Sequence, residues 1–331
     1  MIKDLAESTD ACIERTVPVC IIGAGTAGIF LAQQLRQHNI DVLILEAGST
    51  LARKPEAIGQ KCFHHGLHYR GAEQGRSFGL GGTSVLWGGQ MIPLTASDMA
   101  ARPKVNLPSW PVDYEEIADY FTLVKQTLGL CPDNPLEEKS LLTKHFPAFS
   151  QFSPDFQLRL SQWLPFEQRN FAKAFSSQLD TDPNLEIWLN ASVVSLGQCP
   201  DNPKKITSIH SKSPNGKNLT VYPQILIVCA GALESTRLML EFNESSENLI
   251  TKFGAPLGRY FADHLSVTCG RFEAKNWRRY NLETAAIFEK GVMRTPRLEI
   301  ASQTQEELSL TSAFAHFTFI TQGDTGLDIV K

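Results

Sequence analysis

Three closely spaced glycines near the amino terminus have the pattern of a phosphate-binding turn. The segment reads Gly23-Ala24-Gly25-Thr26-Ala27-Gly28. In such a turn the first glycine permits the tight bend, the second lets a pyrophosphate approach the main chain, and the third lets the following helix pack closely on the strand. The unpaired N–H groups and the positive dipole end of that helix then face the phosphates. The spacing therefore predicts a dinucleotide site.

The surrounding residues supply the elements that must position this turn. Residues 16–45 read as an apolar β-branched run, the glycines, a segment of helical period and a second apolar run, which is the order of a βαβ unit. Glu46 ends the second run, 18 positions after Gly28. It is placed to accept hydrogen bonds from an adenosine ribose, and its charge disfavours a 2′-phosphate.

A second glycine-rich segment, FGLGGTSVLWGGQ, runs from Phe78 to Gln90. Its first half, Gly81 to Ser84, is typical of a turn at a helix start, where the Thr83 and Ser84 hydroxyls can bind phosphate or backbone. Its second half, Gly88 and Gly89, would let the chain lie flat against a flavin face. An NAD enzyme has no general need for such a segment here, so it favours FAD; a glycine-rich surface loop is the plain alternative. Trp87 either covers the flavin edge or packs as a partly buried ring. The candidate cofactor residues in this segment are Gly81, Gly82, Thr83, Ser84, Trp87, Gly88 and Gly89.

Five motifs in the same order resemble the glucose-methanol-choline family of FAD-dependent oxidoreductases. They are GAGTAG with Glu46, GLGGTSVLWGG, SWPVDYEEIADYF, ILIVCAGALESTRLML and LGRYFADH. The resemblance implies oxidation of a CH–OH group of an alcohol or sugar, with hydride transfer to flavin N5 and a histidine as proton acceptor. It implies that Val193 brackets the adenine and that Ala230 and Gly231 lie near the pyrophosphate. A plain strand residue and a simple strand-to-helix turn are the alternatives at these positions.

Two histidines that members of this family use do not appear at the matching places in this sequence. Some relatives attach FAD through a histidine in the second glycine segment, which has none here, so we expect non-covalent binding. The sequence ends at Lys331, before the segment that carries the family's catalytic histidine, and His316 is a weak substitute. We therefore expect either an enzyme completed by another chain, or a truncated or pseudoenzyme form that binds FAD weakly without catalysis. The electron acceptor could be oxygen, a quinone or a protein.

Composition excludes several other classes. The 331 residues carry a formal charge of −4, no long basic run and no stretch long enough to span a membrane, which argues against nucleic acid and membrane partners. With no secretory signal pattern, a cytoplasmic location is expected. The seven cysteines are scattered without a CxxC pair. No metal site is expected either, because Gly66 interrupts the cluster of His64, His65 and His68 and no acidic or thiolate partner has ligand spacing.

The predicted fold class is α/β, a Rossmann-like FAD-binding domain with a parallel sheet plus an incomplete α+β substrate domain with an antiparallel sheet. We expect the FAD-binding domain to be discontinuous, over residues 1–130 and 186–265. The partial substrate domain takes residues 131–185 and 266–331.

Overall fold

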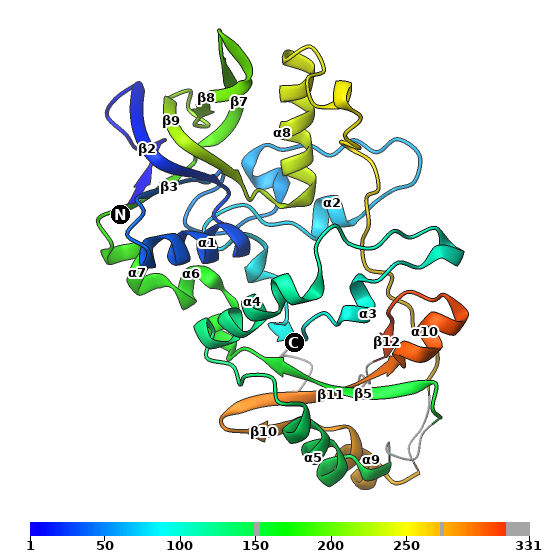
Figure 1. Cartoon of the computed structure of the whole chain (residues 1–331). Coiled ribbons are helices and arrows are strands. Elements are labelled where there is room, and N and C mark those ends of the chain that lie inside the picture. Colours follow the sequence, from blue (N-terminus) through cyan, green and yellow to red (C-terminus); the bar gives the residue numbers. More distant parts are fainter. Residues whose placement is uncertain (149–152, 272–274, 316–331) are drawn as a thin grey trace. The chain divides into compact units, whose positions relative to one another are not determined.

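The computed structural model describes residues 1–148, 153–271 and 275–315, in a chain that forms two compact units (Figure 1). Unit 1 consists of Met1–Gly88 and Phe166–Ser266, and unit 2 consists of Gly89–Pro165 and Val267–Lys331. Both units are therefore discontinuous in sequence.

The bounds of the units differ from the predicted domain bounds in two stretches. Residues 89–130 fall in unit 2, where β4 (Gln90–Met91) pairs with β5 (Phe156–Trp163). Residues 166–185 fall in unit 1, where the Phe175 ring lies edge-on to the Phe30 ring with centroids 6.5 Å apart. These bounds are determined by strand pairing and aromatic packing between residues that are far apart in the sequence. The order of the sequence elements alone does not reveal such contacts.

A seven-stranded sheet forms the centre of unit 1, in the order β1-β6-β3-β2-β9-β8-β7. The pairs from β1 to β9 are parallel, and β8 and β7 extend the sheet in antiparallel pairing. This arrangement confirms the predicted α/β class with a mostly parallel sheet. The strands are β1 (Ile2–Asp4), β2 (Cys12–Ile22), β3 (Val42–Leu45), β6 (Leu185–Leu189), β7 (Ser192–Cys199), β8 (Asn202–Lys212) and β9 (Asn218–Val228).

Helices cover both faces of this sheet because its central strands are apolar on both sides. Helix α8 (Gly231–Ser245) buries Leu238 and Phe242 in one core with β2, β3 and β9. Helix α1 (Thr26–Gln37) packs on the opposite face, where Ile29 and Ala32 are fully buried. The β2–α1–β3 unit is thus the predicted βαβ unit.

Unit 2 is built on an antiparallel sheet in the order β10-β11-β5-β4, with β12 paired to β11. Its strands β10 (Ile287–Glu289), β11 (Val292–Ile300) and β12 (Phe314–Ala315) join β4 and β5. A small core of Leu141, Phe146 and Leu160 lies between α5 and β5. The predicted antiparallel sheet is therefore present.

The remaining helices are short apart from α4 and α5. None of the described helices is long and apolar enough to cross a membrane. They are α2 (Gly71–Gln74), α3 (Ala96–Met99), α4 (Tyr114–Thr127), α5 (Pro135–His145), α6 (Phe171–Ala174), α7 (Ser176–Thr181), α9 (Trp277–Thr284) and α10 (Ser302–Leu308), with 3-10 helices η1 (Pro55–Ile58), η2 (Gly82–Val85), η3 (Pro103–Val105), η5 (Phe166–Arg169) and η6 (Thr251–Phe253).

Candidate cofactor-binding site

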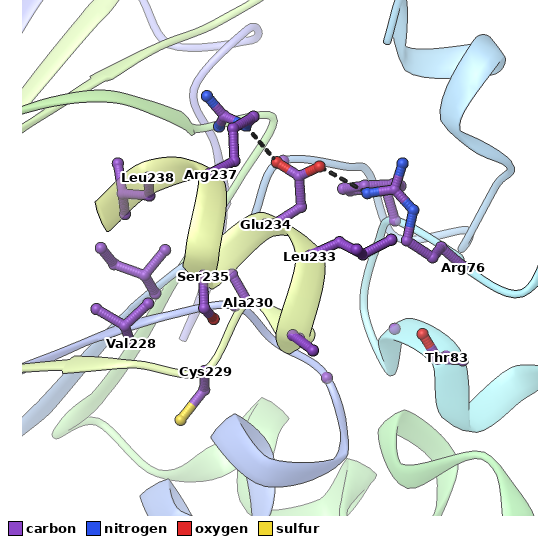
Figure 2. A pocket seen from close by; sticks show the side chains of 18 of the residues that line it. Arg76, Thr83, Val228, Cys229, Ala230, Leu233, Glu234, Ser235, Arg237 and Leu238 are labelled. Carbon is purple, nitrogen blue, oxygen red and sulfur yellow. Dashed lines mark hydrogen bonds and ion pairs between the residues drawn. The ribbon is translucent and has the colours of Figure 1, made fainter. Parts of the chain in front are cut away.

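The carboxyl ends of β2, β3 and β9 meet at one edge of the unit 1 sheet. Ile22 is in register with Leu45 of β3 and with Val228 of β9. The chain continues this alignment for one residue, since the Gly23 N–H donates to the Leu45 carbonyl and the Cys229 N–H donates to the Ile22 carbonyl, both at 2.8 Å. A cavity of about 770 Å³ opens at this edge (Figure 2).

The first glycine turn is held so tightly that two of its positions admit no side chain. Gly23 has φ +103°, and a Cβ there would lie 2.6 Å from the Cys229 carbonyl oxygen. A Cβ on Gly28 would lie 2.0 Å from the Gly23 carbonyl oxygen, which shows how closely α1 packs on the turn. Gly25 differs, because a Cβ there would have no neighbour nearer than 4.0 Å. Its open side, with Thr26 and Ala27, lines the cavity.

Helix α1 begins beside this open side without a side-chain cap. Gly25 is the N-cap residue and supplies no side-chain hydrogen bond to the first turn. The first-turn N–H groups of a helix have no partner within the helix, and the dipole there is positive. The uncapped start of α1 thus borders the cavity, and its role in binding a phosphate stays a prediction.

Glu46 is a buried carboxylate shared by three chain segments. Its Oε2 accepts the Ala24 N–H at 2.8 Å, and its Oε1 accepts the N–H groups of Gly48 at 2.9 Å and Gly79 at 2.8 Å. Burial raises the pKa of Glu46, and the backbone N–H groups act in the opposite direction. Glu46 also lines the cavity. The role at a ribose stays a prediction, and Glu46 also has a structural role that the sequence did not reveal.

The second glycine segment packs directly on the first. The Gly81 N–H donates to the Ala24 carbonyl at 2.9 Å. Gly82 has φ +51°, and a Cβ on it would lie 2.7 Å from the Gly25 Cα. Gly82 begins the 3-10 helix η2, in agreement with the predicted turn at a helix start. The bare backbone at this point thus serves contact between two loops, and Thr83 lines the cavity beside them.

The end of the second glycine segment leads away from the cavity. The Trp87 Nε1–H donates to the Arg169 carbonyl at 2.7 Å, and its ring lies edge-on to Phe171 at 6.1 Å. Trp87 therefore packs within unit 1, which is the second of its two interpretations. Gly88 is the last residue of this part of unit 1, and Gly89 begins unit 2 with φ +76°. That these two glycines lie against a flavin stays a prediction.

Helix α8 and the segment before η2 form a charged wall that the sequence did not reveal (Figure 2). Arg76 Nη1 lies 2.6 Å from Glu234 Oε1, and Arg237 Nε lies 2.7 Å from Glu234 Oε2. Burial acts to raise the pKa of Glu234, but the hydrogen bonds from Arg237 and Arg76 outweigh it and hold the pKa below its usual value. Only the i,i+3 pair of Glu234 and Arg237 is visible in the sequence, since Arg76 is 158 positions away.

Tyr69 and two residues of the segment after α8 complete the lining. The Tyr69 hydroxyl donates to Asp263 Oδ2, and its ring lies edge-on to Phe261 with centroids 5.0 Å apart. The hydrogen bond to Asp263 raises the pKa of Tyr69. Burial raises the pKa of Cys229, which also lines the cavity.

The cavity brings together most of the predicted cofactor residues. Those that line it are Gly23, Gly25, Thr26, Ala27, Glu46, Gly82, Thr83, Val193, Ala230 and Gly231. Gly28, Gly81 and Ser84 stand behind this lining and shape it, as Ser84 does by accepting the Phe171 N–H at 3.0 Å. The weak catalytic candidate His316 lies outside the described residues.

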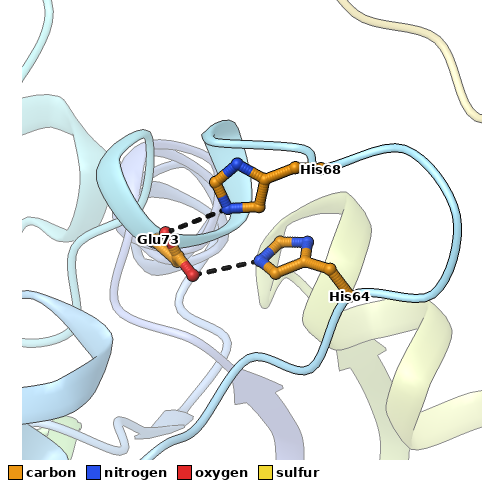
Figure 3. A group of neighbouring side chains, drawn as sticks. All are labelled: His64, His68 and Glu73. Carbon is orange, nitrogen blue, oxygen red and sulfur yellow. Dashed lines mark hydrogen bonds and ion pairs between the residues drawn. The ribbon is translucent and has the colours of Figure 1, made fainter.

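Three side chains lie close together near the start of α2, two from the loop before this helix and one from the helix itself. His64 and His68 both lie against Glu73 (Figure 3). The sequence shows no acidic partner at ligand spacing, but the turn at Gly66, with φ +82°, folds the loop back so that both histidines lie against Glu73 of α2. His65 is exposed beside them and is not part of the group.

Comparison with known proteins identifies the domain that contains the cavity. A family model described as "FAD binding domain" matches residues 16–266, which is most of the chain. The chain belongs to the FAD-binding domain family. The match confirms the FAD-binding domain that the resemblance to the glucose-methanol-choline oxidoreductases implies.

Individual relatives are more distant. The 6'''-hydroxyparomomycin C oxidase of Streptomyces lividus is 25% identical over 130 residues, which are 36% of this chain and 24% of that protein. The solved structure of pyridoxine 4-oxidase from Mesorbium loti is 19% identical with a TM-score of 0.47, over 68% of this chain and 51% of the other. A formate oxidase structure is 14% identical with a TM-score of 0.46, over 69% and 48%. The chain thus spans about half or less of the length of these proteins.

Proposed function

We propose that this chain binds FAD non-covalently in the unit 1 cavity and serves as the cofactor domain of an oxidoreductase that acts on a CH–OH group of an alcohol or sugar. The observation that carries the proposal is the junction of the two glycine segments beside the uncapped start of α1. It provides a bare, positively polarised surface where a pyrophosphate requires one.

The residues present fit FAD in size and in chemistry. The cavity of about 770 Å³ lies within the range of cofactor sites, which is about 300–1,000 Å³. A Cβ on Gly25 or on Gly231 would meet no protein atom closer than 4.0 Å, so these positions keep space open at the turn and at the start of α8. Glu46, Val193 and Ala191 border the part of the cavity that suits a ribose and adenine.

Non-covalent attachment is supported by the side chains around the cavity. In the part of the chain that the structure describes, no histidine lines it. The cysteine and the tyrosine that line it are Cys229 and Tyr69, and the pKa of each is raised above its usual value. Both therefore stay protonated near neutral pH and are poor nucleophiles.

The reaction assigned to the cofactor is the acceptance of a hydride from an alcohol carbon. What this chain's residues do is bind and orient: the start of α1 holds the phosphates, Glu46 fixes the glycine segments, and the Arg76–Glu234–Arg237 group fixes α8 against them. The family resemblance is the support for the CH–OH substrate, with oxygen, a quinone or a protein as acceptor.

A second candidate is a chain that binds FAD without catalysis. It is favoured by the same observation that no histidine lines the cavity among the described residues, because alcohol oxidation needs a base near the reacting hydroxyl. A separate chain that supplies the histidine would reconcile the two candidates.

The test is reconstitution of the purified chain with FAD, followed by desalting, a visible spectrum and acid precipitation. We expect about one FAD per chain that is released into the supernatant on precipitation. Flavin that stays with the precipitate contradicts non-covalent binding, and a colourless protein contradicts the proposal as a whole. Bleaching of bound FAD by a panel of alcohols and sugars without oxygen then separates the catalytic candidate from the non-catalytic one.

A further inference from the structure

The loop between η1 and α2, together with α2, carries a group of potential metal ligands that do not line the cavity. His64 Nε2 lies 3.0 Å from Glu73 Oε1, and His68 Nε2 lies 3.6 Å from Glu73 Oε2. The two imidazole rings stand edge-to-face with centroids 4.2 Å apart, and one donor atom from each residue lies within 4.8 Å of the others. Figure 3 shows all three side chains converging on one point from the loop and the helix.

These separations match those of ligands around one small ion. With Zn²⁺ bonds of about 2.0–2.2 Å to nitrogen and oxygen, ligand atoms of a tetrahedral site lie about 3.4 Å apart. The two nitrogen–oxygen distances are already close to this value. The remaining adjustment falls on His68, whose side chain is 54% exposed and free to turn, whereas His64 and Glu73 are more enclosed.

Glu73 lies between the two imidazoles and supplies the carboxylate of the group, with one oxygen toward each ring. The Tyr69 N–H contacts His64 Nδ1 at 3.4 Å, and Nε2 is the ring nitrogen that faces Glu73.

We propose that His64, His68 and Glu73 form a binding site for a divalent transition-metal ion, with Zn²⁺ as the best match. Two imidazole nitrogens and one carboxylate are a donor set that suits Zn²⁺ and its late first-row neighbours, and that suits Mg²⁺ or Ca²⁺ poorly. The exposed side of the group leaves a fourth position for water.

The site is anchored to the cavity wall through Arg76. The Arg76 Nε–H donates to the Ala72 carbonyl in α2 at 2.7 Å, and the same side chain pairs with Glu234 of α8. Tyr69 and Gly71, which lie between the ligands in sequence, line the cavity. A bound ion therefore fixes the loop that forms one side of the FAD site.

The experiment titrates the chelator-treated full chain with Co²⁺ and Zn²⁺ without FAD, by calorimetry and by the visible spectrum of Co²⁺. We expect one equivalent, and nitrogen and oxygen bands without the charge-transfer band of a thiolate. His64→Ala and His68→Ala each weaken binding by about a hundredfold or more, since even outer-shell partners contribute about 10- to 100-fold. Glu73→Gln also weakens metal binding.

His65→Ala is the matched control, because His65 stands in the same loop outside the group. It keeps the affinity within about twofold of the unchanged chain. Unchanged stoichiometry and affinity in the His64→Ala/His68→Ala double variant, an equal loss in His65→Ala, or a thiolate spectrum would each overturn the proposal. Circular dichroism of each apo variant shows that the fold is intact, so a loss of binding reports on the ligands.

Discussion

At the scale of single residues, the site depends on glycines that lack a Cβ atom and on one buried carboxylate. Gly82 and Gly25 bring two loops into backbone contact, and neither loop could approach if Gly82 carried a side chain. Glu46 then joins both loops by accepting N–H groups from Ala24 and Gly79. The cofactor surface is thus an assembly of two glycine segments fastened by one carboxylate.

Gly82→Ala is expected to weaken FAD binding by about tenfold or more, because its Cβ collides with the Gly25 Cα at 2.7 Å. The left-handed backbone adds about 1–2 kcal/mol of strain. Gly216→Ala is the control, since Gly216 also has positive φ but open space around it. Quenching of FAD fluorescence gives the affinities. Equal affinity in both variants would show that loop contact does not shape the site.

Glu46→Gln is expected to lower the free energy of unfolding by about 1–3 kcal/mol. The amide replaces one acceptor oxygen by an NH₂ group that faces backbone N–H donors, so at least one buried donor loses its partner. Urea unfolding at pH 7 measures the change. A loss below about 0.5 kcal/mol would mean that the three hydrogen bonds are replaceable.

At the scale of elements, α8 performs two tasks with adjacent faces. Leu238 and Phe242 are buried against the sheet, and Glu234 and Arg237 reach the cavity and the Arg76 segment. The ion pairs therefore fix the position of the charged cavity wall, while apolar packing holds α8 on the sheet.

The attachment of α8 to Arg76 is expected to weaken in acid. Because the folded pKa of Glu234 lies below its ordinary value of 4.5, its contribution to stability is present above that pH and is lost as pH falls through the folded pKa. Glu234→Gln removes this part of the pH dependence and lowers stability at pH 7 by about 1–3 kcal/mol. Urea midpoints from pH 3 to 7 measure both effects.

Glu241→Gln provides the matched comparison. Glu241 pairs with the same Arg237 at 2.6 Å, but its side chain is 52% exposed, so this pair contributes little. If Glu241→Gln changes the acid profile as much as Glu234→Gln does, the shared arginine and not the buried carboxylate controls the effect.

At the scale of the whole molecule, the chain passes between its two units at residues 88–89, 165–166 and 266–267. Each unit has its own sheet and its own buried apolar cluster. The residues that line the FAD cavity all belong to unit 1. Damage to the core of unit 2 should therefore leave the cofactor site in place.

Phe146→Ala tests this separation. Phe146 is 1% exposed in the unit 2 core, so its truncation is expected to destabilise that unit by about 3–5 kcal/mol. FAD affinity should stay within about twofold, and denaturation followed by flavin release and by circular dichroism should give two separate transitions. Parallel loss of FAD affinity and of structure would show one cooperative unit.

The sequence predicted best those features that are set by local pattern. The βαβ unit, the turn at Gly23 and the start of η2 at Gly82 follow from glycine spacing and apolar periodicity. Contacts that depend on how loops fold back cannot be predicted from the periodicity of the sequence. Examples are the pair of Arg76 and Glu234 and the pair of His68 and Glu73. Trp87 shows the same limit, since its partner carbonyl at Arg169 is 82 positions away.

The pairing of β2 with β9 also has a consequence for synthesis. Cys12 of β2 pairs with Asn218 of β9, so these neighbours leave the ribosome 206 residues apart. At about 5–20 residues per second, β2 waits about 10–40 seconds for its partner. During that time the apolar edge of β2 that later pairs with β9 is exposed. Yield in cells should therefore depend on chaperones that bind nascent chains, more than on the final stability of the protein.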